Sequence, residues 1–188
     1  MEIGLCMART RKNRRGIAVY LDTCIVSGLA KGDLAPPDVR ALEWILQQHK
    51  QRHLRLATSA VTKFELAKIP ARFRIAHSAV NELLDVVPAR VTFGFWGAER
   101  AIEDPNWWTF ERLTWLLPDA IDAEHLTFAI QAGFHHFITT DERTILRHKR
   151  KLLSDFDVRA MSPRAFKRYW VRSMDSRHPK PPGLMYDY

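Results

Sequence analysis

Residues 17 to 21 read Ile-Ala-Val-Tyr-Leu, and Asp22 follows them directly. This apolar run has the length of a strand and is rich in β-branched and aromatic residues, which fit a pleated, buried surface. A run without polar alternation is typical of a strand that is covered on both faces. The segment therefore predicts the central strand of a sheet, with an aspartate at its carboxyl end.

Shorter strands are predicted around this one, at residues 54–58, 137–139 and 158–161. Helical patterns separate them, and strands that alternate with helices favour parallel pairing through right-handed crossovers. The sequence thus predicts an open α/β sheet that lies between helices. The predicted helices are residues 23–31, ended by Gly32; a helix that opens at Pro36 and Pro37; residues 59–68; residues 119–132, ended by Gly133; and a last helix from Ser162 and Pro163 to Trp170.

The length of 188 residues, with 46% apolar and 27% charged residues, indicates one globular domain. We expect a basic N-terminal arm at 1–16, a folded domain at 17–170 and an extended C-terminal tail at 171–188. Residues 88–108 show no clear period and are predicted as loop and short helix.

The uncharged stretch 126–140 is too short and too polar for a transmembrane helix, and the N-terminus lacks a secretion signal. These features predict a cytoplasmic protein without a membrane partner.

Positive charge is concentrated near the ends of the chain, whose net charge is +8. Residues 1–15 hold five Lys or Arg against one acid, residues 143–180 hold twelve against three, and residues 16–142 hold twelve against sixteen. These charges could simply solvate a helix and an arm. Their combined asymmetry favours a nucleic acid as partner.

Four carboxylates are placed where parallel strands of such a sheet end. Asp22 and Asp141 directly follow predicted strands, Glu65 lies in the helix after the second strand, and Asp122 lies in the first turn of the helix 119–132. Ligands of open α/β sheets bind beyond this edge. Carboxylates crowded there would repel one another unless a cation lay among them, and an oxygen-rich set without cysteine favours Mg²⁺ or Mn²⁺. The pattern predicts a metal site for phosphodiester hydrolysis.

Each acid also has a purely structural interpretation. Asp22 and Asp141 could be helix N-caps, Thr62 and Glu65 match a capping box, and Asp122 suits the positive end of a helix dipole. Asp119, one turn before Asp122, could be a fifth acid or a cap. His125 could reach the site, but a lone histidine on an amphipathic helix is more often packed or solvated, so it is left out of the catalytic set.

Four segments together resemble the successive motifs of PIN-domain nucleases. They are VYLDT at 19–23, TSAVTKFEL at 58–66, DAEHL at 122–126 and ITTD at 138–141, and the resemblance spans residues 17–163. It implies a three-layer α/β/α sandwich and a metal-dependent endoribonuclease, as in the toxins of VapBC-type toxin–antitoxin pairs. An RNA substrate, an antitoxin partner and a homodimer are implied with it. The acidic positions of the family fall on Asp22, Glu65, Asp122 and Asp141.

Two further positions bear on this resemblance. Thr139 matches a hydroxyl residue that precedes the last acid by two positions, where it could orient a carboxylate or simply bond locally. Cys24 departs from the pattern, because the family often has Asn or Ser there and a thiol is a weaker donor. The alternative to a nuclease is a non-catalytic, PIN-like RNA-binding protein. A haloacid-dehalogenase-like phosphatase ranks third, because Cys24 stands where its pattern has a second aspartate.

Overall fold

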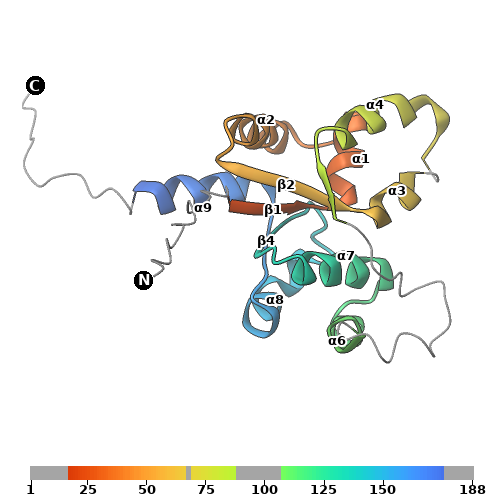
Figure 1. Ribbon diagram of the computed structural model, residues 1–188, viewed down its shortest axis with the longest axis vertical. Coiled ribbons are helices and arrows are strands. Elements are labelled where there is room, and N and C mark those ends of the chain that lie inside the picture. The colour runs from red at the N-terminus through yellow and green to blue at the C-terminus, as the bar shows by residue number, and fades with distance from the viewer. Residues whose placement is uncertain (1–16, 67–68, 88–106, 176–188) are drawn as a thin grey trace, which may run out of the picture.

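The computed structural model describes residues 17–66, 69–87 and 107–175, which build a five-stranded, all-parallel sheet (Figure 1). The strands lie in the order β3-β2-β1-β4-β5, so the predicted central strand, β1, is the middle one. The strands are β1 (Ile17–Leu21), β2 (Leu54–Ser59), β3 (Asp85–Val87), β4 (His136–Ile138) and β5 (Arg159–Met161).

Helices cover both faces of this sheet. Figure 1 shows α1, α2 and α4 on one side, and α6, α7 and α8 on the other. The helices are α1 (Thr23–Lys31), α2 (Pro36–Lys50), α3 (Ala60–Leu66), α4 (Ala71–Asn81), α6 (Trp107–Leu116), α7 (Ala120–Gln131), α8 (Lys149–Phe156) and α9 (Pro163–Asp175), with a 3-10 turn, η1 (Leu146–His148), before α8.

The alternation of side chains along the strands produces two separate cores. Val19 and Leu21 of β1 pack on one face with α1, α2 and α9, whereas Tyr20 packs on the other face with α6, α7 and α8. Both faces of β1 are thus buried, as its unbroken apolar run requires. The first core also contains Ile25, Leu42, Leu56, Ile138 and Phe166, and the second contains Leu113, Leu126, Phe137, Leu152 and Ala160.

The register of the strands brings the chain segments after them to one edge. Leu21 of β1 is paired with Ile138 of β4, and the backbone N–H of Asp22 donates to the Ile138 carbonyl over 3.0 Å. Ser59 ends β2 beside Val87 of β3, and α3 follows at once. The residues after β1, β2 and β4 therefore share the carboxyl edge of the sheet.

The α/β class and the parallel pairing are confirmed, but several elements were not predicted. They are β3, α4, α6 and α8, and α9 runs on to Asp175 instead of ending at Trp170. β3 has only three residues, of which Asp85 and Val86 are exposed, and α8 buries Leu152 alone, so neither carries a strong apolar period. α6 begins at Trp107, inside the segment expected to be irregular. The arm at 1–16, residues 88–106 and the tail from residue 176 on lie outside the described residues.

Strand ends also differ slightly from the prediction. β4 begins at His136 and ends at Ile138, so Thr139 lies just beyond it, and β5 begins at Arg159. Within the residues that the structure describes, no helix combines the length and the apolar character needed to cross a bilayer.

Candidate functional site

Asp22 occupies the N-cap position of α1, but its carboxylate does not cap the helix. Its Oδ2 atom accepts hydrogen bonds from Thr139 Oγ1 over 2.7 Å and from Cys24 Sγ over 3.1 Å. The carboxylate therefore faces the segment after β4 rather than the amide groups of its own helix. The N-cap interpretation of this side chain is wrong, although Asp22 is only 5% exposed and its backbone does begin the helix.

Thr139 connects the first and the last of the predicted acids. Its hydroxyl donates to Asp22 and accepts the backbone N–H of Asp141 over 3.0 Å. Because Thr139 is fully buried between two elements far apart in the chain, this contact is more than a local bond. The bond fixes the direction of the Asp22 carboxylate. Of the two interpretations of Thr139, it agrees with the one in which the hydroxyl orients a carboxylate.

Asp141 holds the turn that comes after it through hydrogen bonds to Arg143 and Thr144. Its Oδ1 atom accepts the backbone N–H groups of Arg143 (2.9 Å) and Thr144 (3.0 Å), which is the bonding of a cap. Burial alone would raise the pKa of Asp141, but the bonds from Thr144 and Arg143 outweigh it and hold the pKa below its usual value. Asp141 is thus a charged carboxylate at neutral pH.

The hydroxyl group of Thr144 lies between two carboxylates. It contacts Asp122 Oδ2 at 2.7 Å and also Asp141 Oδ2. A hydroxyl has a single proton, so it can donate to only one of these acids at a time. When both carboxylates are charged, the one that does not receive the Thr144 proton faces the hydroxyl oxygen without a hydrogen bond. Protonation of that carboxylate, or a bound cation, would remove this repulsion.

Electrostatics at Asp122 reflect this crowding. Burial raises the pKa of Asp122 to about 6, and the charges of Asp22, Asp119 and Asp141 add to the rise, against the lowering by the Thr144 bond. The aspartate is therefore partly protonated just below neutral pH. Like charges at short range disfavour ionisation in this way, and a bound cation reverses the effect.

Glu65 reaches the site through His125. Its Oε2 atom lies 3.1 Å from His125 Nε2, and Thr23 Oγ1 lies 3.1 Å from the same nitrogen. The other nitrogen of the ring, Nδ1, lies 2.7 Å from the hydroxyl of Tyr20. His125 is packed, only 1% exposed, and joins β1, α1 and α3 to α7.

The charge state of His125 depends on the acids around it. Burial would lower the pKa of His125, but the hydrogen bond to Glu65 and the charges of Asp22, Glu65 and Asp122 together outweigh burial and raise it. The imidazolium form is therefore favoured more than in a free histidine. When protonated, the ring offsets part of the negative charge of the surrounding carboxylates.

Cys24 takes the place of the expected Asn or Ser without losing the contact with Asp22. Besides donating to Asp22, its sulfur lies 3.2 Å from Thr139 Oγ1 and accepts the backbone N–H of Thr140 over 3.3 Å. Burial, followed by the charge of Asp22, raises the pKa of Cys24 to about 12. The thiol stays protonated and remains available as a donor.

The structure thus brings Asp22, Asp122 and Asp141 into one hydrogen-bonded group, with Glu65 attached through His125. We call these four acids the carboxylate edge. Asp119 caps α7, accepting the N–H of Ile121 over 2.8 Å, and acts on the edge only through its charge. Sequence reasoning did not select Thr144 or His125. Each lies three residues after an acid, Asp141 and Asp122 respectively, and this spacing is the signal that could have identified them.

The donor chemistry of the carboxylate edge fits a hard divalent cation. It offers carboxylate and hydroxyl oxygens, and the one cysteine that contacts it is protonated, so soft metals are disfavoured. Burial, and then the charges of Asp22, Asp119 and Asp141, raise the pKa of Asp122, so a nearby cation would favour its charged form. In the described part of the chain, however, no three His, Cys, Asp or Glu side chains converge closely enough to hold a single ion.

Comparison with known proteins adds no family to this picture. No protein-family profile matches the sequence, and neither the curated proteins nor the solved structures contain a match. The function must therefore be inferred from the geometry of the site itself.

Proposed function

We propose that this chain is a metal-dependent endoribonuclease that hydrolyses RNA phosphodiester bonds at the carboxylate edge. One observation carries the proposal: Asp22, Asp122 and Asp141 are linked through the hydroxyl groups of Thr139 and Thr144. Beyond the effect of burial, the charges of Asp22 and Asp141 disfavour ionisation of Asp122, and a bound cation would offset this effect. The resemblance to PIN-domain nucleases points to the same four residues.

The four acids would hold one or two ions of Mg²⁺ or Mn²⁺. Such an ion lowers the pKa of the attacking water and neutralises charge that develops on the phosphate. Thr139 keeps the Asp22 carboxylate turned toward the segment after β4, and His125 holds Glu65. In-line attack by water on phosphorus expels the ribose oxygen, and no side chain is covalently modified. Basic residues from Arg143 to Lys151 lie next to Asp141 and would hold the RNA backbone.

The biological setting belongs to the same proposal. A PIN-like toxin would act in the cytoplasm as a homodimer, with an antitoxin protein as its partner. These assignments come from the sequence resemblance alone and are tested by co-purification of the chain with the product of a neighbouring gene. The nuclease proposal does not depend on them.

A non-catalytic, PIN-like RNA-binding protein is the second candidate. One observation favours it, namely that the described acids do not converge on a single point. Such a protein would bind RNA through its basic residues with or without a divalent ion. The two candidates therefore differ in their response to metal.

The deciding experiment is cleavage of a mixed pool of structured and single-stranded RNAs in Mg²⁺, Mn²⁺ or EDTA. We expect cutting that needs the metal and that falls by at least about 100-fold in Asp22→Asn and Asp141→Asn, as for loss of a group that stabilises transition-state charge. Asp85→Asn is the matched control, because Asp85 is exposed and begins β3, the outermost strand on its side of the sheet. RNA binding without cutting in any metal would replace the nuclease with the binding protein.

A further inference from the structure

One side of α9 carries a row of arginines that is inclined to the helix axis. Arg164, Arg168 and Arg172 are spaced four residues apart, so they lie above one another on the helix, with a rise of about 6 Å between neighbours. All three are exposed. No carboxylate in the described part of the chain forms an ion pair with any of them. In this part of the protein, none of the three arginines is neutralised by a direct ion pair.

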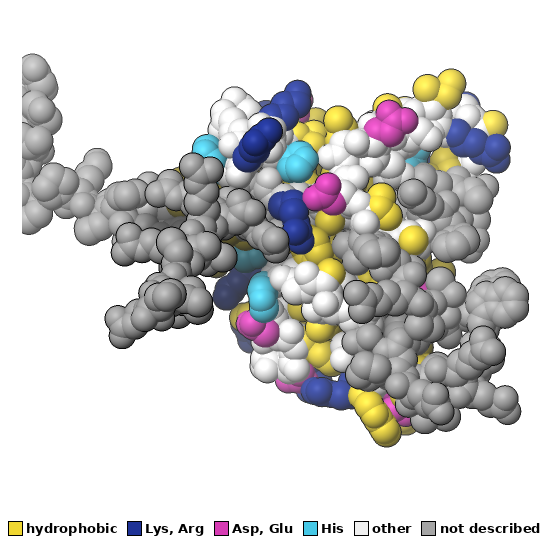
Figure 2. All heavy atoms as spheres, viewed as in Figure 1, with side chains coloured by type: hydrophobic (Ala, Val, Ile, Leu, Met, Phe, Trp, Pro, Cys, Tyr) yellow, Lys and Arg dark blue, Asp and Glu magenta, His cyan; other side chains and the backbone are white. Residues whose placement is uncertain are grey.

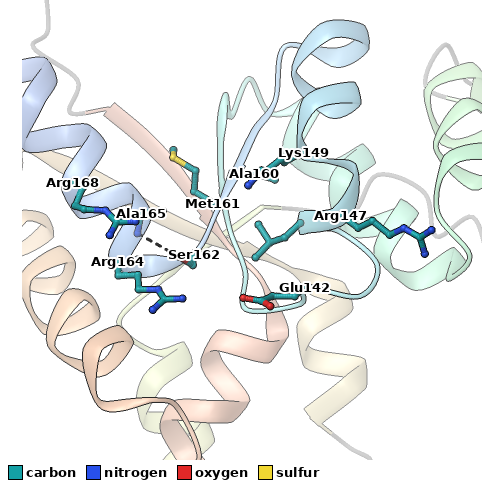
Figure 3. A pocket seen from close by; sticks show the side chains of 10 residues that line it. Glu142, Arg147, Lys149, Ala160, Met161, Ser162, Arg164, Ala165 and Arg168 are labelled. Atoms are coloured by element: carbon teal, nitrogen blue, oxygen red, sulfur yellow. Dashed lines mark hydrogen bonds between the residues drawn. The ribbon is translucent and has the colours of Figure 1, made fainter.

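This row borders two adjoining hollows. A cavity of about 410 Å³ opens at the carboxyl end of β5, between α9 and residues 142–149, and Arg164 and Arg168 reach toward it from the helix (Figure 3). A second cavity of about 470 Å³ continues along α9, lined by Arg168 and Arg172. Arg168 and Ala165 line both, so the two hollows form one groove, which we call the arginine groove.

A third hollow leads from the arginine groove toward the carboxylate edge. This cavity of about 510 Å³ shares Glu142, Leu146, Ser162 and Arg164 with the first, and its other end is lined by Cys24 and Thr140. Cys24 in turn donates to Asp22. The groove is therefore continuous with the surface beside the proposed reaction site, although none of the four acids lines it.

The sign of the charge changes along this path. The hollow beside Cys24 has Asp33, Asp38 and Glu142 against Lys31 and Arg164, whereas the first part of the arginine groove has only Glu142 against four cations: Arg147, Lys149, Arg164 and Arg168. Among the described residues, no acid lines the far part. On the face shown in Figure 2, by contrast, side chains of both signs are interspersed. The hollow beside Cys24 thus has more acidic than basic side chains, whereas the arginine groove is predominantly basic.

We infer that the arginine groove binds the phosphodiester backbone of single-stranded RNA on one side of the cleavage site. The inference rests on the proposed function for the identity of the strand as RNA. Arginine suits this role because its planar donors bind phosphate oxygens in pairs. The rise of about 6 Å between successive arginines is comparable to the separation of phosphates along one strand.

The floor of the groove favours an unpaired strand over a duplex. Leu146, Ala160, Met161 and Ala165 line the first hollow together with the cations. An unpaired nucleotide can lay its ribose or base against such an apolar floor, with its phosphate at the cationic rim, whereas a duplex keeps its bases inside. Because the cations contact only the backbone, the groove provides affinity and not sequence preference.

The test measures binding in EDTA, so that it does not depend on cleavage. Fluorescence anisotropy follows a short, labelled single-stranded RNA of mixed sequence at several salt concentrations. For the triple variant Arg164→Ala, Arg168→Ala, Arg172→Ala we expect at least about a 10-fold loss of affinity at moderate salt, and a salt dependence lower by about 2 in log–log slope, since each phosphate contact on a single strand contributes about 0.7.

A charge reversal with a matched control separates the groove from general electrostatics. Arg168→Glu should weaken binding, whereas Arg72→Glu should leave it within about twofold, because Arg72 lies in the first turn of α4, which packs on α1 and lies away from α9 (Figure 1). Arg168 and Arg72 are both exposed, so both variants should fold. Circular dichroism and melting temperature verify this.

The outcomes separate the groove from the nuclease. If wild type binds RNA in EDTA, does not cut it in Mg²⁺ or Mn²⁺, and still loses affinity in the groove variants, the groove stands and the nuclease proposal fails. Equal affinity of wild type and triple variant would overturn the groove even if wild type cuts RNA. Equal competition by a duplex would overturn the preference for an unpaired strand, and binding of single-stranded DNA alone would overturn the assignment to RNA.

Discussion

Two histidines at opposite edges of the same sheet have opposite surroundings. His125 lies at the carboxylate edge, where Glu65, Thr23 and Tyr20 bond to its ring. His136 begins β4 at the amino edge, where its ring packs against Phe166 and Tyr169 and, among the described residues, neither nitrogen has a hydrogen-bond partner. Burial disfavours the charged form of both rings.

The pKa shifts of the two rings nevertheless run in opposite directions. Burial, followed by the charges of Arg159 and His135, lowers the pKa of His136 to about 4. At His125 the neighbouring acids overcome burial and raise the pKa. The opposite directions follow from the surroundings: acids near His125 raise its pKa against the effect of burial, whereas among the described residues no such excess of negative charge faces His136.

The largest expected effect comes from removing charge at the carboxylate edge. In Asp22→Asn we expect the pKa of His125 to fall, because one of the charges that raise it is gone, together with a loss of RNA cleavage of at least about 100-fold. NMR titration of the His125 ring and a cleavage assay measure the two. An unchanged His125 pKa would mean that Asp22 does not contribute to the negative field, and the comparison between the two edges would lose its explanation.

The second prediction concerns His136 and acid stability. Its pKa is about 4 in the folded chain and 6.5 in the unfolded chain, so the unfolded state binds more protons between these values and stability falls as pH drops from 6.5 to 4. Because the ring is partly exposed, we expect a loss of about 1–2 kcal/mol. Urea unfolding measures this loss. Between pH 6.5 and 4, the free energy of unfolding of His136→Phe should fall by less than that of wild type.

His135 provides the control for this measurement. It is the sequence neighbour of His136 but is exposed, with Nδ1 3.0 Å from Asp157 Oδ2. Because burial is the largest cause of the His136 shift and the charge of His135 a smaller one, His135→Gln should keep most of the acid-dependent loss of stability that His136→Phe reduces. If His136→Phe and wild type lose the same free energy of unfolding between pH 6.5 and 4, another group is responsible for the loss.

The third prediction concerns the crowding of Asp122. Its pKa is about 6 in the folded chain and 3.8 in the unfolded chain, so the folded state binds more protons between these values and stability falls as pH rises from 3.8 to 6. Asp122→Asn removes this cost. In EDTA at pH 7.5 we expect its free energy of unfolding to exceed that of wild type by about 1 kcal/mol, after discounting for the partial exposure of the group.

The dependence on pH identifies the cause of any such gain. The difference between Asp122→Asn and wild type should shrink toward pH 4, where Asp122 is protonated, whereas Asp85→Asn should show no comparable gain at pH 7.5. Mg²⁺ should raise the melting temperature of wild type more than that of Asp122→Asn, since an ion stabilises the state that binds it. A variant less stable than wild type at pH 7.5 would contradict the account of crowding.

The fold class could be predicted from the sequence of β1, and the candidate site from the acids that follow the strands at their carboxyl ends. The apolar run 17–21 determines a central strand, and parallel pairing then brings Asp22 and Asp141 to one edge, so their proximity could be predicted. The bridging by Thr144 could not, because it depends on how the turn after Asp141 is directed toward α7. Local periodicity also cannot detect elements such as β3, whose three residues form a strand only because β2 lies beside them.

The smallest effect is expected at Cys24, where the chain departs from the PIN-like pattern. Cys24→Ser replaces a weak donor with a stronger but shorter one, so the two changes oppose each other at Asp22. We expect cleavage within about fivefold of wild type, which corresponds to roughly 1 kcal/mol or less for one hydrogen bond. Cys24→Ala removes the donor and leaves Asp22 with Thr139 alone, so it should lose more activity than Cys24→Ser. If both variants lose the same activity, the thiol acts by filling space, and the hydrogen bond to Asp22 contributes little to holding the carboxylate.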